Sequence, residues 1–291
     1  MYQCPFGAIT DKSYILDVIN LMKGSENNKN YKVYAVVAPA ISSQFTYAKL
    51  GQVISGLKKL GFYTVVEAAL GADMVADAES KELVEKGFLT SSCCPAFVSY
   101  IEKSFPDLLP FVSHNLSPMA TISKYLKEHE EPCKVVFIGP CTAKKSEVQR
   151  KEVQPYVDAA MTFEELQALF DSRDILLRDQ EITEWNQASY YGRMFATSGG
   201  VAAAVAEILK EMKVDDFELN AISCDGIDKC KTALLKASKG VLPNNFIEGM
   251  VCMRGCVGGM GNPTWREDIS EEIEEHAEEA EITEILTHLE L

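Results

Sequence analysis

From Lys134 to Lys145 the chain reads KVVFIGPCTAKK. The first half is an apolar run typical of a buried strand, and a cysteine loop follows it directly. Two more strand-like runs lead into cysteines, one just ahead of Cys93 and Cys94 and the other ending at Cys252. Because parallel sheets bind ligands beyond the carboxyl ends of their strands, we expect the three loops to meet at one site.

Strand-like segments rich in Val, Ile and Phe alternate with longer amphipathic segments. The strand-like segments are Lys32–Ala40, Thr64–Ala69, Phe88–Ser92, Lys134–Pro140, Phe217–Ser223 and Phe246–Cys252. The amphipathic segments between them include Tyr47–Leu60, Met74–Lys86, Thr162–Phe170 and Gly200–Met212. This alternation predicts an α/β protein with a mostly parallel sheet flanked by helices.

A polar stretch marks the boundary that we expect between two lobes. It runs from Lys127 to Pro132, just before the strand that starts near Cys133. It divides a main domain of residues 31–266 into lobes of about 31–126 and 127–266. No internal repeat or low-complexity linker is visible in the sequence.

The C-terminal tail, residues 267–291, holds eleven acidic residues and no Lys or Arg, while the whole chain has a net charge of −15. Apolar residues in the tail fall at helical spacing, from Ile269 and Ile273 to Ile285 and Leu289. The pattern predicts a helix with one apolar face. A solvated helix that packs on the body is favoured over a segment that docks onto a partner.

Bulk composition bounds the class of protein. With 291 residues, 47% of them hydrophobic and 24% charged, the chain is long enough for one large domain or two lobes with a real core. No apolar run approaches the roughly 18 residues that a membrane span needs, and the N-terminus lacks a secretory signal. We therefore expect a cytoplasmic protein with no membrane partner. The acidic balance argues against a nucleic-acid partner.

Nine cysteines are an unusual number for such a chain. The odd count, without a signal peptide, argues against a disulfide framework, so some thiols are expected to be metal ligands or reactive groups. Structural zinc sites favour paired C-x-x-C knuckles, which this sequence lacks. The histidines, which are scattered and show no ligand spacing, are His114, His129, His276 and His288.

A cysteine nucleophile is the other rival to a metal cluster. Cys93 or Cys94 would need a histidine base, and His114 is the nearest in sequence. Two adjacent cysteines have no obvious role in that chemistry. A cysteine-ligated cluster is therefore favoured over a nucleophile and over inert buried thiols.

The three cysteine loops resemble, in order and separation, those of the iron-only hydrogenases. They read SSCCPAF at Ser91–Phe97, GPCTAKK at Gly139–Lys145 and MVCMRGCVGGMGNP at Met250–Pro263. The resemblance extends from about Tyr31 to Pro263, and the three loops together are far more specific than any one alone. It implies an α/β fold of two lobes, each with a mostly parallel sheet flanked by helices, and a metal cluster in the cleft between them.

The resemblance also implies a ligand set. The four cysteines that it assigns to a [4Fe–4S] cluster are Cys94, Cys141, Cys252 and Cys256. Cys256 would also bridge through its sulfur to a diiron unit with CO, cyanide and dithiolate ligands, which completes the H-cluster. Lys144 matches a lysine that donates a hydrogen bond to a cyanide, and an ammonium suits a buried anion.

Cys93 matches the thiol that carries protons in the family, and the implied relay runs from it through Glu82, Ser113 and Glu79. The two glutamates stand three residues apart and so share a helix face, although two solvated carboxylates are the alternative interpretation. Lys86 stands where an arginine is usual at the outer end. The implied pocket walls, for some of which core packing is the alternative, are Ala38, Pro39, Phe195 and Met250.

Several positions depart from the family pattern. Gly139 stands in place of a methionine, Met119 in place of a glutamine and Leu116 in place of a lysine. Fewer donors and an altered wall are expected to shift the cluster potential and oxygen access. The pattern resembles a divergent branch of the family, with a sensory branch as one interpretation.

The remaining cysteines lie outside this pattern. Cys4 looks like the last cysteine of a bacterial ferredoxin motif whose other three are absent, so residues 1–30 are interpreted as the remnant of a ferredoxin-like region. Cys133 is interpreted as a buried thiol. Cys224 and Cys230 are a minor candidate for a second metal site.

The implied activity is reversible reduction of protons to dihydrogen. Electrons would come from a ferredoxin-like carrier, and hydrogenase maturation proteins would supply the diiron unit. Two other functions stay open: a hydrogen sensor with slow turnover, and a non-catalytic iron–sulfur assembly protein that shares the cubane loops. Lys144 and Cys93 argue against the last, because a bare cubane needs neither.

Overall fold

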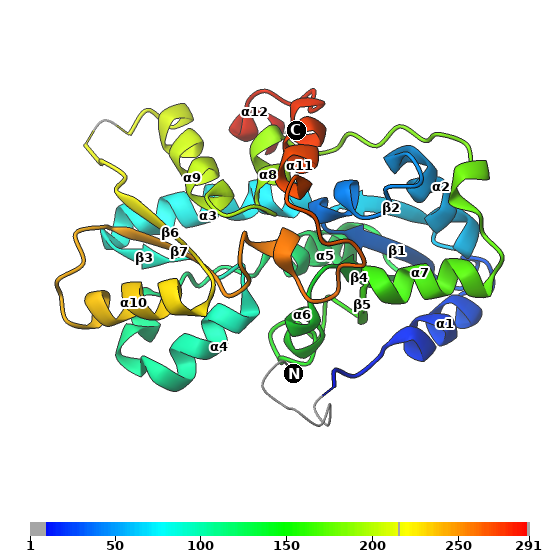
Figure 1. The fold of residues 1–291 in the computed structure, drawn as a ribbon, viewed down its shortest axis with the longest axis horizontal. Helices are drawn as coiled ribbons and strands as arrows, with labels where there is room; N and C mark the ends of the chain where they lie inside the picture. The colour runs from blue at the N-terminus through cyan, green and yellow to red at the C-terminus, as the bar shows by residue number, and fades with distance from the viewer. Residues whose placement is uncertain (1–9, 215, 290–291) are drawn as a thin grey trace.

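The computed structural model of the chain describes residues 10–214 and 216–289 and contains two parallel sheets. The first sheet has the strand order β2-β1-β4-β5, and the second has the order β3-β7-β6. Their strands are β1 (Lys32–Val37), β2 (Thr64–Glu67), β3 (Leu89–Thr90), β4 (Cys133–Gly139), β5 (Ala159–Thr162), β6 (Ala221–Asp225) and β7 (Phe246–Met250). Helices flank both sheets, which confirms the predicted α/β class (Figure 1).

Helices precede, connect and follow these strands. They are α1 (Ile15–Gly24), α2 (Leu50–Leu60), α3 (Ala68–Lys86), α4 (Pro95–Ser104), α5 (Pro118–His129), α6 (Thr142–Glu147), α7 (Phe163–Ser172), α8 (Tyr190–Met194), α9 (Gly200–Glu211), α10 (Ile227–Ser238), α11 (Ile269–Glu278) and α12 (Ile285–Leu289). Short 3-10 turns occur at Pro39–Ser43, Pro106–Phe111, Leu177–Asp179 and Cys256–Gly258.

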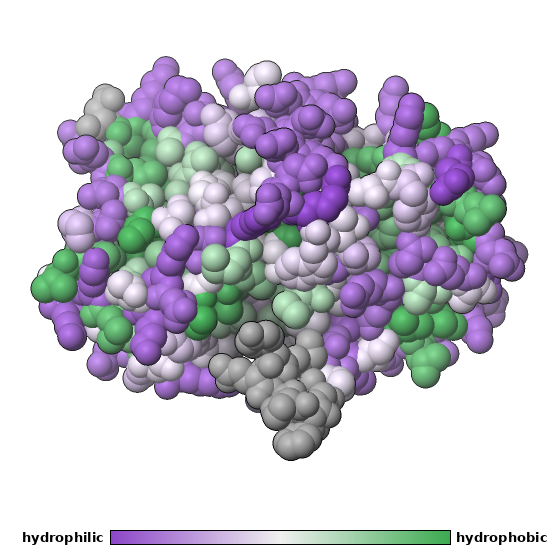
Figure 2. Space-filling view, in the orientation of Figure 1, coloured by the Kyte–Doolittle hydropathy of each residue, from purple (hydrophilic) through white to green (hydrophobic). Residues whose placement is uncertain are grey.

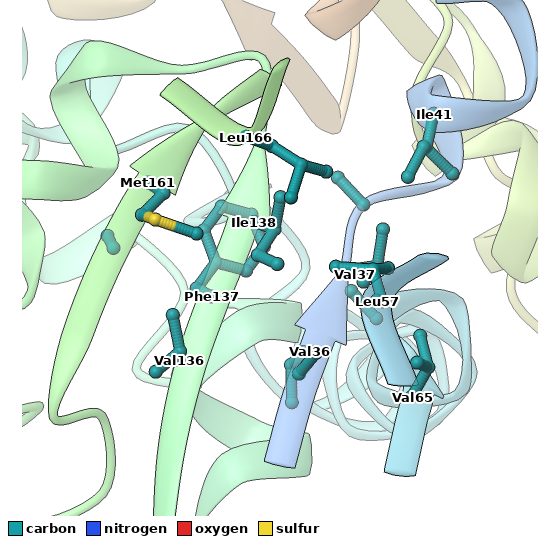
Figure 3. Packing of buried hydrophobic residues seen from close by; sticks show 14 of the residues in the cluster. Val36, Val37, Ile41, Leu57, Val65, Val136, Phe137, Ile138, Met161 and Leu166 are labelled. Carbon is teal, nitrogen blue, oxygen red and sulfur yellow. The ribbon is translucent and has the colours of Figure 1, made fainter. Parts of the chain in front are cut away.

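The central strands of the first sheet are almost continuously apolar. Every residue from Val33 to Val37 is buried, and so is every residue from Val135 to Ile138. Strands of a parallel sheet show this pattern when helices cover both faces. β1 and β4 are in register with Val36 opposite Phe137, and Figure 3 shows both side chains within the packed core.

One long helix connects the two sheets. α3 begins at Ala68, directly after β2, and ends at Lys86, shortly before β3. Its 19 residues span about 28 Å at 1.5 Å of rise per residue. It packs against α5, α8 and α9, so it forms a shared wall of both halves (Figure 1).

The two sheets do not follow the predicted lobe boundary at Lys127. β1 and β2 precede that residue but pair with β4 and β5, which follow it, while β3 precedes it and pairs with β7. The division into 31–126 and 127–266 is therefore wrong. The polar stretch at Lys127–Pro132 is the turn between α5 and β4, and local polarity marks a surface turn whether or not a domain ends there.

Strand boundaries also differ in places from those predicted. The segment predicted as a strand at Thr64–Ala69 stops at Glu67, because Ala68 already begins α3. The strand predicted at Phe217–Ser223 instead covers Ala221–Asp225, where it pairs with β7. Pairing with a neighbouring strand fixes these limits, and a single sequence does not show that neighbour.

The acidic tail forms α11 and α12. Ile269, Ile273 and Ala277 of α11 are buried, and the helix packs on α8 and on the turn at Pro39–Ser43. The surface around α11 is mostly hydrophilic in the view of Figure 2. Cys4, and with it the ferredoxin interpretation, lies outside the described residues. No helix in the described part of the chain has the length and apolar character required to span a bilayer.

Candidate metal centre

All three predicted ligand loops begin at or just after the carboxyl ends of parallel strands. β3 leads to Cys94, which is the N-cap of α4, and β4 leads to Cys141, which is the N-cap of α6. β7 ends at Met250, two residues before Cys252. Because the strands within each sheet run parallel, their loops collect at the carboxyl end of that sheet, and loops from both sheets line one cavity.

These loops surround one cavity of about 90 Å³. A buried water occupies roughly 10–15 Å³ on the same measure, so the cavity has room for a guest much larger than one water. The residues named from the sequence that line it are Ala38, Pro39, Cys93, Cys94, Met119, Cys141, Lys144, Phe195, Met250, Cys252 and Cys256. Sequence reasoning missed further lining residues, which are Ala68, Ala72, Pro118, Phe137, Gly192 and Gly259.

The donor set fits a polynuclear cluster better than a single ion. Within residues 10–214 and 216–289, no three Cys, His, Asp or Glu side chains come close enough to hold one metal ion. A tetrahedral zinc would need four ligand atoms at about 2.0–2.3 Å from one point. Sulfurs that stand around a cavity suit a larger group, and cysteine thiolates are the usual ligands of iron–sulfur cubanes.

Burial raises the pKa of the Cys93, Cys141, Cys252 and Cys256 thiols around the cavity. The pKa of Cys252 rises to about 12, and that of Cys256 rises well above its usual value. After burial, the next causes of the rise in the Cys256 pKa are the thiols of Cys141, Cys94 and Cys252, which line the same cavity. A coordinated metal would supply the positive charge that deprotonates such thiols.

Two backbone features shape the ligand loops. Gly255 has φ of 84°, a conformation that favours glycine, and a Cβ there would lie 2.7 Å from Met250 Sδ. Gly139, which stands in place of a family methionine, has no room for a side chain because its Cβ would lie 2.6 Å from the ring of Phe137. Phe137 therefore fills the space that the departure at Gly139 leaves.

Lys144 is buried beside the cavity, where it donates two hydrogen bonds and forms an ion pair with Glu147. Its Nζ contacts Glu147 Oε2 at 2.7 Å, Ser117 Oγ at 2.8 Å and the Cys93 carbonyl at 3.3 Å. Burial alone would lower the pKa of Lys144, but the Glu147 carboxylate outweighs it and the pKa lies above its usual value. The ammonium therefore stays charged, and the long bond to Cys93 is the easiest to exchange for a ligand anion.

Glu147 and Ser117 were missed by sequence reasoning. Ser117 Oγ donates to Glu147 Oε1 at 2.5 Å, so the two side chains form one buried network with Lys144. The spacing of three residues between Lys144 and Glu147 on α6 was the available signal, since residues so spaced are neighbours on a helix.

Glu79 is the inner carboxyl of the predicted relay. It is fully buried on α3, and its Oε1 accepts a hydrogen bond from Ser92 N at 3.1 Å. Burial raises its pKa to about 7, and its charge also raises the pKa of the Cys93 thiol. Its Oε2 has no hydrogen-bond partner among the residues that the structure describes. Such an oxygen is suited to carry a proton.

Glu82 lies nearer the surface, with a side chain 11% exposed. It accepts hydrogen bonds from the His114 backbone at 3.1 and 3.2 Å and from Asn115 Nδ2 at 2.9 Å. Asn115 Nδ2 also reaches Ser113 Oγ at 3.1 Å, and that hydroxyl helps to oppose the rise in the Glu79 pKa.

The order predicted for the relay, with Glu82 before Ser113 and Glu79, is therefore wrong. The structure places Glu79 next to the cavity and Glu82 outside. A spacing of three residues shows that two side chains share a face but not which end of the helix points inward. The N-terminal end of α3 lies at the cavity, where Ala68 and Ala72 line it, so the earlier glutamate is the inner one.

The other cysteines stay apart from this cavity. Cys133 is buried at the start of β4 and donates to the Leu126 carbonyl at 3.7 Å. Cys224 and Cys230 are buried, and Cys230 Sγ lies 3.5 Å from the Met250 carbonyl. Neither belongs to a set of three candidate ligands in the described ranges, so nothing supports a second metal there.

Known proteins match the part of the chain that contains the residues around the cavity. The family described as "Iron only hydrogenase large subunit, C-terminal domain" matches residues 31–260. Iron hydrogenase 1 of Clostridium pasteurianum is 27% identical over 314 aligned residues, which cover 89% of this chain and 54% of that protein. The NADP-reducing hydrogenase subunit HndD of Solidesulfovibrio fructosivorans is 27% identical over 91% of this chain and 55% of its own. The chain spans about half the length of these two relatives.

Two further similarities bear on fold and function. A solved structure of the [FeFe]-hydrogenase HydA1 from Chlamydomonas reinhardtii superposes with a TM-score of 0.77 and 23% identity, covering 95% of this chain and 92% of that one. At that identity the likeness shows the fold. The cytosolic Fe-S cluster assembly factor NAR1 of Kluyveromyces lactis is 28% identical over 55% of this chain and 36% of that protein.

Proposed function

Because the chain belongs to the iron-only hydrogenase family, within the C-terminal domain of its large subunit, we propose that it binds an H-cluster and interconverts protons and dihydrogen. The observation that supports this proposal is one cavity lined by five cysteines and Lys144, with a buried carboxyl behind it. A ferredoxin-like carrier would exchange electrons with the chain, and hydrogenase maturation proteins would deliver the diiron unit.

The residues around the cavity have distinct proposed roles. Cys94, Cys141, Cys252 and Cys256 would hold the [4Fe–4S] cluster, with Cys256 shared with the diiron unit. When bound, the H-cluster supplies the redox chemistry that pairs electrons with protons. Lys144 would donate a hydrogen bond to its cyanide. The apolar walls, which exclude water and so strengthen that bond, are Ala38, Pro39, Phe195 and Met250.

Protons would move along α3. The thiol of Cys93 stays protonated because burial raises its pKa, so Sγ can donate a proton and then be reprotonated. Glu79, with a pKa of about 7, can give or take a proton near neutral pH, which is the condition for an efficient acid–base group. Ser113 and Glu82 would continue the route outward.

Reconstitution tests this proposal. The chain is loaded with the cubane and then with the diiron unit, and hydrogen evolution from a reduced viologen is measured alongside the infrared bands of CO and cyanide. We expect both bands and turnover. In Cys93→Ser the bands should persist while turnover falls about 100-fold or more, as for loss of a positioned acid–base group. A fully loaded chain that neither evolves nor consumes dihydrogen would refute the proposal.

A second candidate, iron–sulfur assembly without catalysis, is favoured by the assembly factor among the relatives. The contacts of Lys144 with Ser117, Glu147 and the Cys93 carbonyl also favour it, because these protein groups hold the ammonium without a ligand. This candidate predicts a cubane that forms normally and an infrared spectrum without CO or cyanide bands. A sensor of the same family would show the bands but only slow turnover at full loading.

A further inference from the structure

The outer end of the α3 route carries a histidine. His114 has a side chain 72% exposed, and its Nδ1 lies 2.8 Å from Glu82 Oε1. Its own backbone N–H also donates to both oxygens of Glu82. The imidazole is therefore held at the point where a buried carboxylate first meets solvent.

The same ring nitrogen faces both a proton acceptor and a proton donor. Besides Glu82, Nδ1 lies 3.1 Å from Lys86 Nζ, which is itself 2.7 Å from Glu82 Oε1. When Nδ1 carries a proton it can donate to Glu82, and when it does not it can accept from Lys86. Both states of the ring are thus hydrogen-bonded, which is what repeated proton transfer requires.

A cavity of about 170 Å³ adjoins the same histidine. His114 and Asn115 line it together with the hydroxyl-bearing Ser92 and Ser113, the two serines beside Glu79. Across the cavity the charged groups are Glu147, Arg150 and Glu152, while Glu82 and Lys86 approach from α3. The cavity is large enough for several waters, so the ring lies between bulk solvent and the relay.

We propose that His114 collects protons from solvent and passes them to Glu82, an inference that rests on the proposed hydrogenase function. Nε2 binds a proton from hydronium or a buffer acid, and Nδ1 releases its proton to Glu82 Oε1. Lys86 then donates a hydrogen bond to the vacated Nδ1. Exchange with solvent, in which Nε2 releases one proton and Nδ1 takes up another, restores the starting tautomer of the exposed ring. One proton moves inward in each cycle, and no electron is transferred.

Other histidines lack this arrangement. His129 is also exposed, but its Nδ1 bonds to the Tyr125 carbonyl and its ring stacks on Tyr125. A backbone carbonyl is not an acid–base group, whereas a carboxylate such as that of Glu82 can accept and release a proton. His129→Ala is therefore the matched control for loss of an exposed imidazole.

The first experiment measures hydrogen evolution by the loaded chain across the pH range. In His114→Ala we expect the rate to fall about tenfold on the alkaline side, where solvent protons are scarce, and added imidazole to restore most of it. The backbone bond to Glu82 survives this substitution, and the infrared bands should match those of the wild type. His129→Ala should keep the wild-type rate. A wild-type rate in His114→Ala, or a slow rate that imidazole does not change, would overturn the proposal.

The second experiment needs no metal. The ¹⁵N resonances of the histidine rings show which nitrogen carries the proton, and we expect Nδ1–H for His114 in the wild type. Glu82→Gln should move that proton to Nε2 while leaving His129 unchanged. Identical His114 spectra in both proteins would sink the inference. If the loaded wild type is inactive while the ring shift is seen, the proposed function fails but the His114–Glu82 contact stands.

Discussion

Buried charges occur in two regions of the molecule, and they are held in different ways. Where α8 meets the start of α3, Arg193 donates two bonds of 2.9 Å to Glu67 and two more to the Asn186 side chain and the His276 carbonyl. Beside the cavity, Lys144 keeps one long bond and Glu79 keeps an oxygen without a described partner.

The difference separates charges that hold the structure from charges that can serve chemistry. The planar guanidinium of Arg193 fixes Glu67 in one geometry, and both side chains are at most 2% exposed. The ammonium of Lys144 is a point charge that can turn toward a new partner. We expect substitutions at Arg193 or Glu67 to change the stability of the chain. Substitutions at Lys144 or Glu79 should change ligand binding or the pH dependence of stability.

The largest effect should come from Arg193→Met. It leaves the Glu67 carboxylate buried without its cation, and breaking such a pair costs about 3–5 kcal/mol. Urea unfolding measures the loss. Arg150→Met is the control, because Arg150 pairs with Glu102 at the surface and should cost about 1 kcal/mol or less. Equal losses in the two variants would remove the distinction between the regions.

Glu79 should make stability depend on pH. Its pKa rises from 4.5 in the unfolded chain to about 7 on folding, so the native state binds one more proton between those values. The free energy of unfolding contributed by this group is therefore fully present below pH 4.5 and falls by about 3 kcal/mol as pH rises through 7.

Glu79→Gln should remove this contribution to the pH dependence of the free energy of unfolding. Urea unfolding of the protein without metal at about pH 5 and about pH 8 measures the change. Asp73 is the matched residue, because burial also raises its pKa to about 7 and Ser189 is its hydrogen-bond partner. Asp73→Asn should remove a similar slope, and the double variant both. An unchanged slope in Glu79→Gln would mean that this carboxyl does not titrate as its burial indicates.

Lys144→Met should destabilise the chain less than Arg193→Met, by about 1–3 kcal/mol, because Glu147 keeps its bond from Ser117. It should nevertheless weaken retention of the diiron unit, seen as loss or shift of the cyanide bands, while the cubane absorption remains. Lys145→Met is the control, since Lys145 pairs with Asp11 and Glu165 away from the cavity. A spectrum altered equally by both variants would argue against a direct role for Lys144.

The sequence predicted the cysteine loops well because each follows an apolar strand. In a parallel sheet the end of a strand determines where the next residues lie, so Cys94 and Cys141 could be placed without knowing their neighbours. The Arg193–Glu67 pair could not be found in this way, because 126 residues separate its members. The relay order and the lobe boundary were wrong for a related reason. The relay order depends on which end of α3 faces the cavity, and the lobe boundary depends on which strands pair with one another. Only tertiary packing determines either.

Interleaved strand pairing has a consequence for biosynthesis. The second sheet needs β7, and Cys252 and Cys256 emerge from the ribosome after every other predicted sulfur ligand. Until then the cavity lacks two of its five thiols and one of its walls. Iron delivery to the proposed four-sulfur site would therefore wait until Cys256 has been translated, and a nascent chain stalled earlier would expose Cys94 and Cys141 to oxidation.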